Sequence, residues 1–501
     1  LAAEGNFLRT DGRLESTQFD RPKIDLSRTF FTNDSLSKKA VLKTGIYAER
    51  EKNARTSVGA DTLNGLSFWY DLYRLYFQIP ENQGAWQFAG FASQRNDFAP
   101  SGAFFRRNTL ANELNLNGAW NNLRRKKKQN QSLAWVLTLR RLRIEKPELS
   151  NQEPQNTYLG KVDYSLSAWH NALSFNTNYE LGSGQSPKLE FNYLQVNPGE
   201  GQFTWVDRNR DSILQVDEME VAVFQDQASY VRVAVTTSEY IRTNNVLFSP
   251  SLRLEPRLLW PQTNRRWQRL LSRLSTQSSL QINRRTYAEA PDIQVWNPLQ
   301  LNGLADSALA TLSSGWRNAL FINRADPKWD ASIAHGDNRS RLAITTGFEE
   351  RRNQELALHG RLNLGQRWSL ESDLAQTVKS SDNQTFNSRD YDIAALEAGP
   401  KLGWLPSRNV RLTSTLKWKG SRNRLGEKET AEQSNWSAEL TWNPTAKTNA
   451  QGFKASTSLR AKGTFANIRF TGQANSSVAF TMLEGLQNGK NFLWSLNLDR
   501  Q

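Results

Sequence analysis

The segment from Asp207 to Glu218 has the residue types and the spacing of a calcium-binding loop. Ca²⁺ takes about six to eight oxygen ligands, and an EF-hand loop supplies them from positions 1, 3, 5, 7, 9 and 12, with a bidentate glutamate at the last. The residues at these positions are Asp207, Asn209, Asp211, Ile213 (through its carbonyl), Gln215 (or a water in its place) and Glu218. The sequence therefore predicts one bound Ca²⁺.

The same segment also departs from the usual loop. Ser212 stands where a glycine normally provides a left-handed turn, and no helix pair is predicted on either side. Arg208 and Arg210 alternate with the ligand positions and so point away from the centre. A solvated acidic loop with Asx-turns is the alternative interpretation. If the loop is ordered, its carboxylates need a cation, and we predict a structural calcium loop and not a sensor.

Catalytic constellations are not recognisable in the sequence. The chain has no cysteine and no HExxH, GxSxG or phosphate-loop motif. Its three histidines are His170, His335 and His359. Glu371, Asp373 and Glu439 are candidates for an acid–base pair. The water-filled interior of a β-barrel also carries such charges on its wall, where they are solvated. We predict a protein without enzymatic activity.

The chain is strongly basic, with 64 Lys and Arg against 49 Asp and Glu and a formal charge of +15. The run from Arg124 to Lys128 is the densest basic cluster. It suits either a solvated hairpin tip or contact with phosphates, including those of lipopolysaccharide, or with a partner. Neither a recognition helix nor a finger motif is present, so we expect no nucleic-acid partner.

The elements that carry these residues show a two-residue period. Apolar and polar residues alternate in 355–364, 409–418, 435–442 and 492–499, as they do in strands with one apolar and one polar face. Hardly any segment has a helical period, and the short stretch 265–275 is the best candidate. We expect lipid contact for Leu356, Leu358, Leu412, Leu416, Leu440, Leu496 and Leu498. We expect an interior orientation for Arg361, Arg411, Glu439 and Asp499.

Composition and patterning favour a large antiparallel transmembrane β-barrel over a soluble β-sandwich. Hydrophobic residues make up 38% of the chain, too few for spanning helices, yet it has 17 Trp, 12 Tyr and 24 Phe. Tryptophans stand at strand ends, as in the aromatic girdles of barrels. We count about 18–22 strands of roughly 8–12 residues and predict an all-β fold. Strands of this length are long for a β-sandwich.

The whole of 1–501 is predicted to be one barrel fragment, incomplete at both ends because a spanning sheet leaves no free edge. The stretch 197–235 is predicted to be an excursion between strands that carries the calcium loop. Pro291–Lys328 and Ser380–Asp390 are read as further long connections.

One stretch resembles a known family. The glycine-spaced Gly199–Asn209, containing Trp205, and the aromatic–Arg strand Phe224–Arg232 are similar to a segment of large outer-membrane proteins of the Bacteroidota. The resemblance implies an exported envelope protein with a large barrel, and it implies no particular activity.

We therefore expect an integral protein of the cell outer membrane that acts in transport, secretion or assembly of surface material as part of an envelope complex. Its expected partners are outer-membrane lipid, lipopolysaccharide and other envelope proteins. The alternative is a secreted, calcium-stabilised all-β adhesin or glycan-binding protein.

Overall fold

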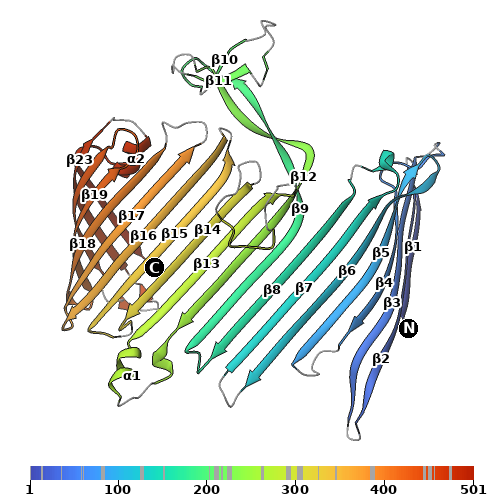
Figure 1. Ribbon diagram of the computed structural model, residues 1–501, viewed down its shortest axis with the longest axis horizontal. Helices are drawn as coiled ribbons and strands as arrows, with labels where there is room; N and C mark the ends of the chain where they lie inside the picture. Colours follow the sequence, from blue (N-terminus) through green and yellow to red (C-terminus); the bar gives the residue numbers. More distant parts are fainter. Residues whose placement is uncertain are drawn as a thin grey trace.

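The long strands of the computed structural model follow one another around a single antiparallel sheet (Figure 1). The structure describes residues 2–12, 15–34, 37–57, 59, 61–79, 85–124, 129–150, 153–201, 203–207, 214–215, 218–222, 228–260, 265–288, 295–301, 309–324, 326–344, 347–383, 390–443, 447–448, 454–455, 457–472 and 477–500. This architecture confirms the predicted all-β, antiparallel fold class.

The strands are, in chain order, β1 (Ala2–Asp11), β2 (Glu15–Asp34), β3 (Ser37–Ser57), β4 (Phe68–Gln78), β5 (Trp86–Ser101), β6 (Phe104–Arg124), β7 (Gln129–Ile144), β8 (Gln155–Ala168), β9 (Leu173–Gln195), β10 (Phe203–Trp205), β11 (Met219–Val221), β12 (Tyr230–Leu254), β13 (Leu274–Tyr287), β14 (Leu309–Ile322), β15 (Trp329–Ile344), β16 (Gly347–Leu364), β17 (Trp368–Asn383), β18 (Tyr391–Ser407), β19 (Val410–Asn423), β20 (Thr430–Trp442), β21 (Lys447–Thr448), β22 (Lys454–Ala455), β23 (Thr457–Thr471) and β24 (Gly489–Arg500).

In the described residues two α-helices interrupt the strands, α1 (Arg266–Leu271) and α2 (Ser477–Leu483). Short 3-10 helices span Pro147–Leu149 and Pro256–Leu258. The stretch with a helical period, 265–275, contains α1, whereas α2 had no clear signal in the sequence. In the part of the chain that the structure describes, no helix is long and apolar enough to span a membrane.

Each long strand pairs with its neighbours along the chain, which gives a meander. Among the described residues the sheet has 22 strands, and of these only β10 and β11 lie outside the meander, as a side branch next to β12. Strands β21 and β22 form a separate pair. Strands β9 and β12 pair directly and extend beyond the rim, so that β10 and β11 stand above the rest of the sheet (Figure 1). The predicted number of strands is therefore confirmed.

The strands are longer than the sequence pattern indicated. The strands of the meander range from 10 residues in β1 to 25 in β12, whereas the alternation suggested about 8–12. Apolar–polar alternation marks only the part of each strand with an apolar face, about 9–11 residues in a spanning strand. Beyond that part both faces are polar, and the pairing continues without the pattern.

The first and last strands lie far apart in the sheet. In Figure 1, β1 lies at the right end, whereas the C-terminus lies in the left half. Among the described residues β1 pairs only with β2, and β24 only with β23. The sheet is therefore not closed by pairing between these two strands.

One predicted connection is wrong. Pro291–Lys328 is not a continuous loop, because β14 occupies Leu309–Ile322 and pairs along its length with β13 and β15. Its apolar face includes Ser314 and Asn318 between Leu312, Trp316 and Leu320. These polar residues hide the two-residue period.

Candidate functional site

The outer face of the sheet carries a band of exposed apolar side chains between two rows of tryptophan. Many leucines of this band are exposed, for example Leu358 at 42%, Leu496 at 60% and Leu498 at 68%. The lower row, at the strand ends opposite the β10–β11 branch, is Trp86, Trp120, Trp329, Trp368, Trp404 and Trp442. A second row, farther up the strands, is Trp316, Trp418 and Trp436.

The leucines predicted to meet lipid share this face. Leu358 lies opposite Ile333 and Leu374 in the neighbouring strands, and Leu412 lies opposite Leu440. No second sheet of the described residues covers these side chains. Apolar patches larger than a few hundred Å² are rare on soluble monomers, so this band needs a partner or a lipid environment.

The opposite face is polar, and several of its charges are paired across strands. Arg361 binds Asp330, Lys401 lies 2.9 Å from Glu371, and Arg460 lies 2.6 Å from Glu439. The acid–base candidates Glu371, Asp373 and Glu439 are thus each held by a basic neighbour, Asp373 by His359 at 2.7 Å. These contacts are those of a solvated wall. Arg411 also lies on this face, while the side chain of Asp499 falls outside the described residues.

A hollow in the polar face spans β12 to β18 and is rich in hydroxyl and amide groups. Arg317, Arg351 and Lys379 lie among serines and asparagines there. Asn338 and Asn353 lie opposite one another in β15 and β16, and Asn353 lies opposite Lys379. Such a surface suits hydrated, anionic or hydroxylated solutes better than apolar ones.

Helix α2 packs on the upper part of the polar face. Val478 and Met482 form a small buried cluster with Ile393 of β18 and Ala431 of β20. The Gln433 amide donates a hydrogen bond of 2.6 Å to the Met482 carbonyl. The helix therefore covers part of the inner wall near one rim (Figure 1).

An ion pair between Glu484 and Lys419 fixes the end of α2. Burial of Glu484 opposes its ionisation. The hydrogen bond from Lys419 and the charges of Lys417 and Lys379 outweigh that effect, so the pKa of Glu484 lies below its ordinary value. The carboxylate is charged at neutral pH.

Half of the predicted calcium ligands lie outside the described residues. Asn209, Asp211 and Ile213 belong to this group, whereas the structure describes Asp207, Gln215 and Glu218. Glu218 is 3% exposed, and its carboxylate accepts a hydrogen bond of 2.9 Å from Trp205 Nε1. Its backbone N–H donates to the Gln215 carbonyl at 3.2 Å. Restricted to described residues, no group of three acidic, His or Cys side chains is placed to hold a metal.

The glycine-spaced motif has a clear backbone role. Gly199 has φ +93°, and Gly201 is packed so closely that a Cβ would lie 2.6 Å from the backbone nitrogen of Tyr230. Phe203 is buried against Tyr193 at 5.1 Å between ring centroids. These contacts hold the segment after β9 against β12, which begins at Tyr230, inside the predicted excursion 197–235. The aromatic stretch 224–227 lies outside the described residues.

A segment of the β13–β14 connection, residues 295–301, lies on the outer face and is called the strap below. Arg284 of β13 is fully buried, and its guanidinium donates to the carbonyls of Gln300 (2.7 Å) and Val295 (3.4 Å). Tyr179 OH donates to the Trp296 carbonyl at 2.6 Å, and Arg339 reaches the Leu301 carbonyl at 3.3 Å.

Sequence reasoning missed the strap. The available signal was Arg284 itself, a charged residue in register with Leu280 and Ile282 on an apolar strand face. The basic run Arg124–Lys128 comes between β6 and β7 in the sequence, and its residues 125–128 lie outside the described residues.

A one-layer antiparallel meander with a polar inner wall and an apolar outer band defines the β-barrel class of architecture. No family model and no curated protein matches the chain. Two solved structures that it resembles are of OccK2 (OpdF) from Pseudomonas aeruginosa, one in complex with glucuronate. Their identities are 9% and 11%, both TM-scores are 0.28, and the matches cover 92% and 97% of this chain and 96% and 98% of OccK2.

A third structure is the ferric-catecholate import receptor Fiu from E. coli K12 in its open form. It is 6% identical with a TM-score of 0.25, and the match covers 92% of this chain and 77% of Fiu. Likenesses with TM-scores this low do not place the chain in a family.

Proposed function

We propose that the chain forms the wall of an integral outer-membrane β-barrel that acts in transport, secretion or assembly of surface material. The carrying observation is the exposed apolar band, with Leu358, Leu412 and Leu440 inside it and tryptophans along its borders. In a bilayer such a band is in contact with hydrocarbon, and the tryptophans lie at headgroup level. The polar inner wall supplies a hydrated path.

The alternative, a secreted adhesin, needs a different environment for the same band. A soluble protein would have to cover these leucines with a second layer, and none is present among the described elements. The pattern of one-layer pairing with tryptophan rows therefore supports the membrane protein.

The connections support an orientation. Outer-membrane barrels have short periplasmic turns and longer extracellular loops. The end of the sheet that carries β10 and β11 also carries the β13–β14 connection and α2, whereas the other end includes the tight turns 365–367 and 408–409 (Figure 1). We place the former end outside the cell, together with the predicted calcium loop.

Membrane fractionation tests this proposal. We expect the full chain to stay in the envelope pellet after a carbonate wash and to leave it only with detergent, because the apolar band must remain covered. Circular dichroism of the detergent-extracted protein should show a β-sheet spectrum. Release as a monodisperse protein in detergent-free buffer would overturn the membrane assignment and favour the adhesin.

We further propose that Asp207, Asn209, Asp211, Ile213, Gln215 and Glu218 bind one structural Ca²⁺. The buried position of Glu218 beside Trp205 supports an ordered loop at this place. We expect about one Ca²⁺ per chain in protein purified without chelator, with marked loss in Asp207→Ala and Glu218→Ala. Asp217→Asn, which removes a neighbouring charge outside the ligand positions, should retain the ion. Equal calcium in all four proteins would end the proposal.

A further inference from the structure

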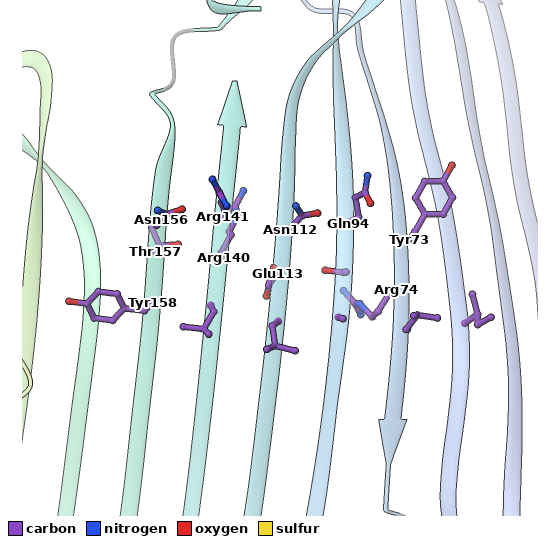
Figure 2. Close-up of a pocket in the computed structure, with 16 residues that line it drawn as sticks. Tyr73, Arg74, Gln94, Asn112, Glu113, Arg140, Arg141, Asn156, Thr157 and Tyr158 are labelled. Carbon is purple, nitrogen blue, oxygen red and sulfur yellow. The ribbon is translucent and has the colours of Figure 1, made fainter. Parts of the chain in front are cut away.

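A shallow groove crosses the outer face of β3 to β8 at the upper boundary of the apolar band (Figure 2). Its floor is a continuous apolar row, one residue from each of five neighbouring strands. Each residue of the row lies opposite the next, in the order Ile46, Leu75, Ala92, Leu114 and Leu139. Ala92 is the smallest of them and leaves a recess between Leu75 and Leu114.

A second row lies one side-chain step above the floor and is polar. In Figure 2, Tyr73, Gln94, Asn112, Arg141 and Asn156 line up across the strands. Their pairing is equally continuous, from Tyr73 opposite Gln94 to Arg141 opposite Asn156. Neighbouring strands lie about 4.8 Å apart, and same-face residues along a strand about 6.6 Å. The apolar floor and the polar edge of the groove are therefore close enough for one ligand to contact both.

The polar edge has a net positive charge. Arg141 is exposed, as is Arg143 one step higher, and neither forms an ion pair with any residue that the structure describes. The carboxylates of the same face in this region are already occupied. Asp71 binds Arg50 at 2.7 Å, and Glu145 binds Arg107 at 2.6 Å.

We propose that this groove binds a membrane lipid with a phosphate headgroup. The guanidinium of Arg141 matches a phosphate in a bidentate geometry, and the amides of Asn112 and Asn156 flank it as further donors. An acyl chain then lies along the floor, with the Ala92 recess giving it room. The inference rests on the proposed membrane function, since it places the outer face of β3 to β8 against lipid.

Charge complementarity selects an anionic lipid over a zwitterionic one. A cation near an anionic lipid surface contributes about 1 kcal/mol, which corresponds to about a fivefold change in binding. The height of Arg141 also fits, because an arginine on a lipid-facing wall is tolerated near the interface and costly at the midplane.

Lipid retention by the full chain in detergent tests the site. The protein is exchanged into micelles with equal phosphatidylglycerol and phosphatidylcholine of the same acyl chains, and bound lipid is counted by native mass spectrometry. We expect preferential retention of phosphatidylglycerol and an approximately fivefold loss of that retention in Arg141→Gln. Arg140→Gln is the matched control, because it removes the same charge from the opposite face of the same strand.

Two further measurements separate the groove from a plain charge effect. Ala92→Trp keeps Arg141 but fills the recess, so it should reduce retention of both lipids. Excess inorganic phosphate should not displace the lipid, and displacement would identify a free-phosphate site instead. Equal losses in Arg140→Gln and Arg141→Gln, or no preference for phosphatidylglycerol, would overturn the lipid site. Failure of the wild-type protein to enter bilayers at all would instead overturn the proposed function.

Discussion

Replacement of Leu358 by arginine is expected to destabilise the folded protein in a bilayer by about 2–4 kcal/mol. Leu358 lies in the middle of the apolar run of β16, between Ile333 and Leu374 of the adjacent strands, and is 42% exposed. In hydrocarbon an arginine there would have neither water nor a counter-ion, and its long side chain would have to reach the headgroups. In water the same exposed position would tolerate arginine at little cost.

The matched control is Ala357→Arg, one residue away on the opposite face. Ala357 lies between Ala334 and Ala375, where small neighbours leave room on the polar wall. Its substitution should change stability by less than about 1 kcal/mol if that wall is hydrated. Urea unfolding in vesicles, followed by tryptophan fluorescence, measures both variants. Equal effects would mean that the two faces share one environment, contrary to a membrane-spanning sheet.

The alternation of residue types was sufficient to predict the sheet and its faces but not the ends of the strands. In β16, Leu356, Leu358, Leu362 and Leu364 mark the apolar face, yet the strand begins at Gly347. From Glu349 to Gln354 both faces are polar, so no period is visible. Backbone pairing continues there because hydrogen bonds between strands do not depend on side-chain polarity.

The strap could not be predicted from local patterns. Arg284 breaks the apolar face of β13, and by itself such a residue reads as the upper limit of the strand's apolar run. Its role depends on the carbonyl groups of Val295 and Gln300. These groups come close to Arg284 only in the folded chain, so no local pattern shows the contact. The calcium loop is the opposite case. The spacing of its ligands is visible in the local sequence. The prediction is tested by measuring the metal content of the protein, because the fold alone does not decide it.

Replacement of Arg284 by leucine is expected to release the strap from the outer wall at a cost on the order of 3 kcal/mol. Arg284 is fully buried, and its guanidinium donates to the carbonyls of Gln300 and Val295. Leucine is apolar, like the neighbouring side chains of Val246 and Ile282. It cannot donate hydrogen bonds, so the buried carbonyls of Gln300 and Val295 lose the guanidinium donor. Unsatisfied buried acceptors cost more than the net value of the bonds they lose. The strap then exchanges its contacts with the wall for water.

Hydrogen exchange of the strap amides, 295–301, measures this release more directly than global unfolding, because local opening has its own free energy. Arg285→Leu is the matched control. Arg285 is the next residue in β13, it is exposed on the opposite face, and its Nε donates to Asn245 at 2.9 Å. Arg284→Lys should be intermediate, since lysine keeps the charge but not the planar fork that serves two carbonyls. Fast exchange in Arg284→Leu alone would identify the guanidinium as the clamp. Slow exchange in both Arg284→Leu and Arg285→Leu would show that the guanidinium does not hold the strap.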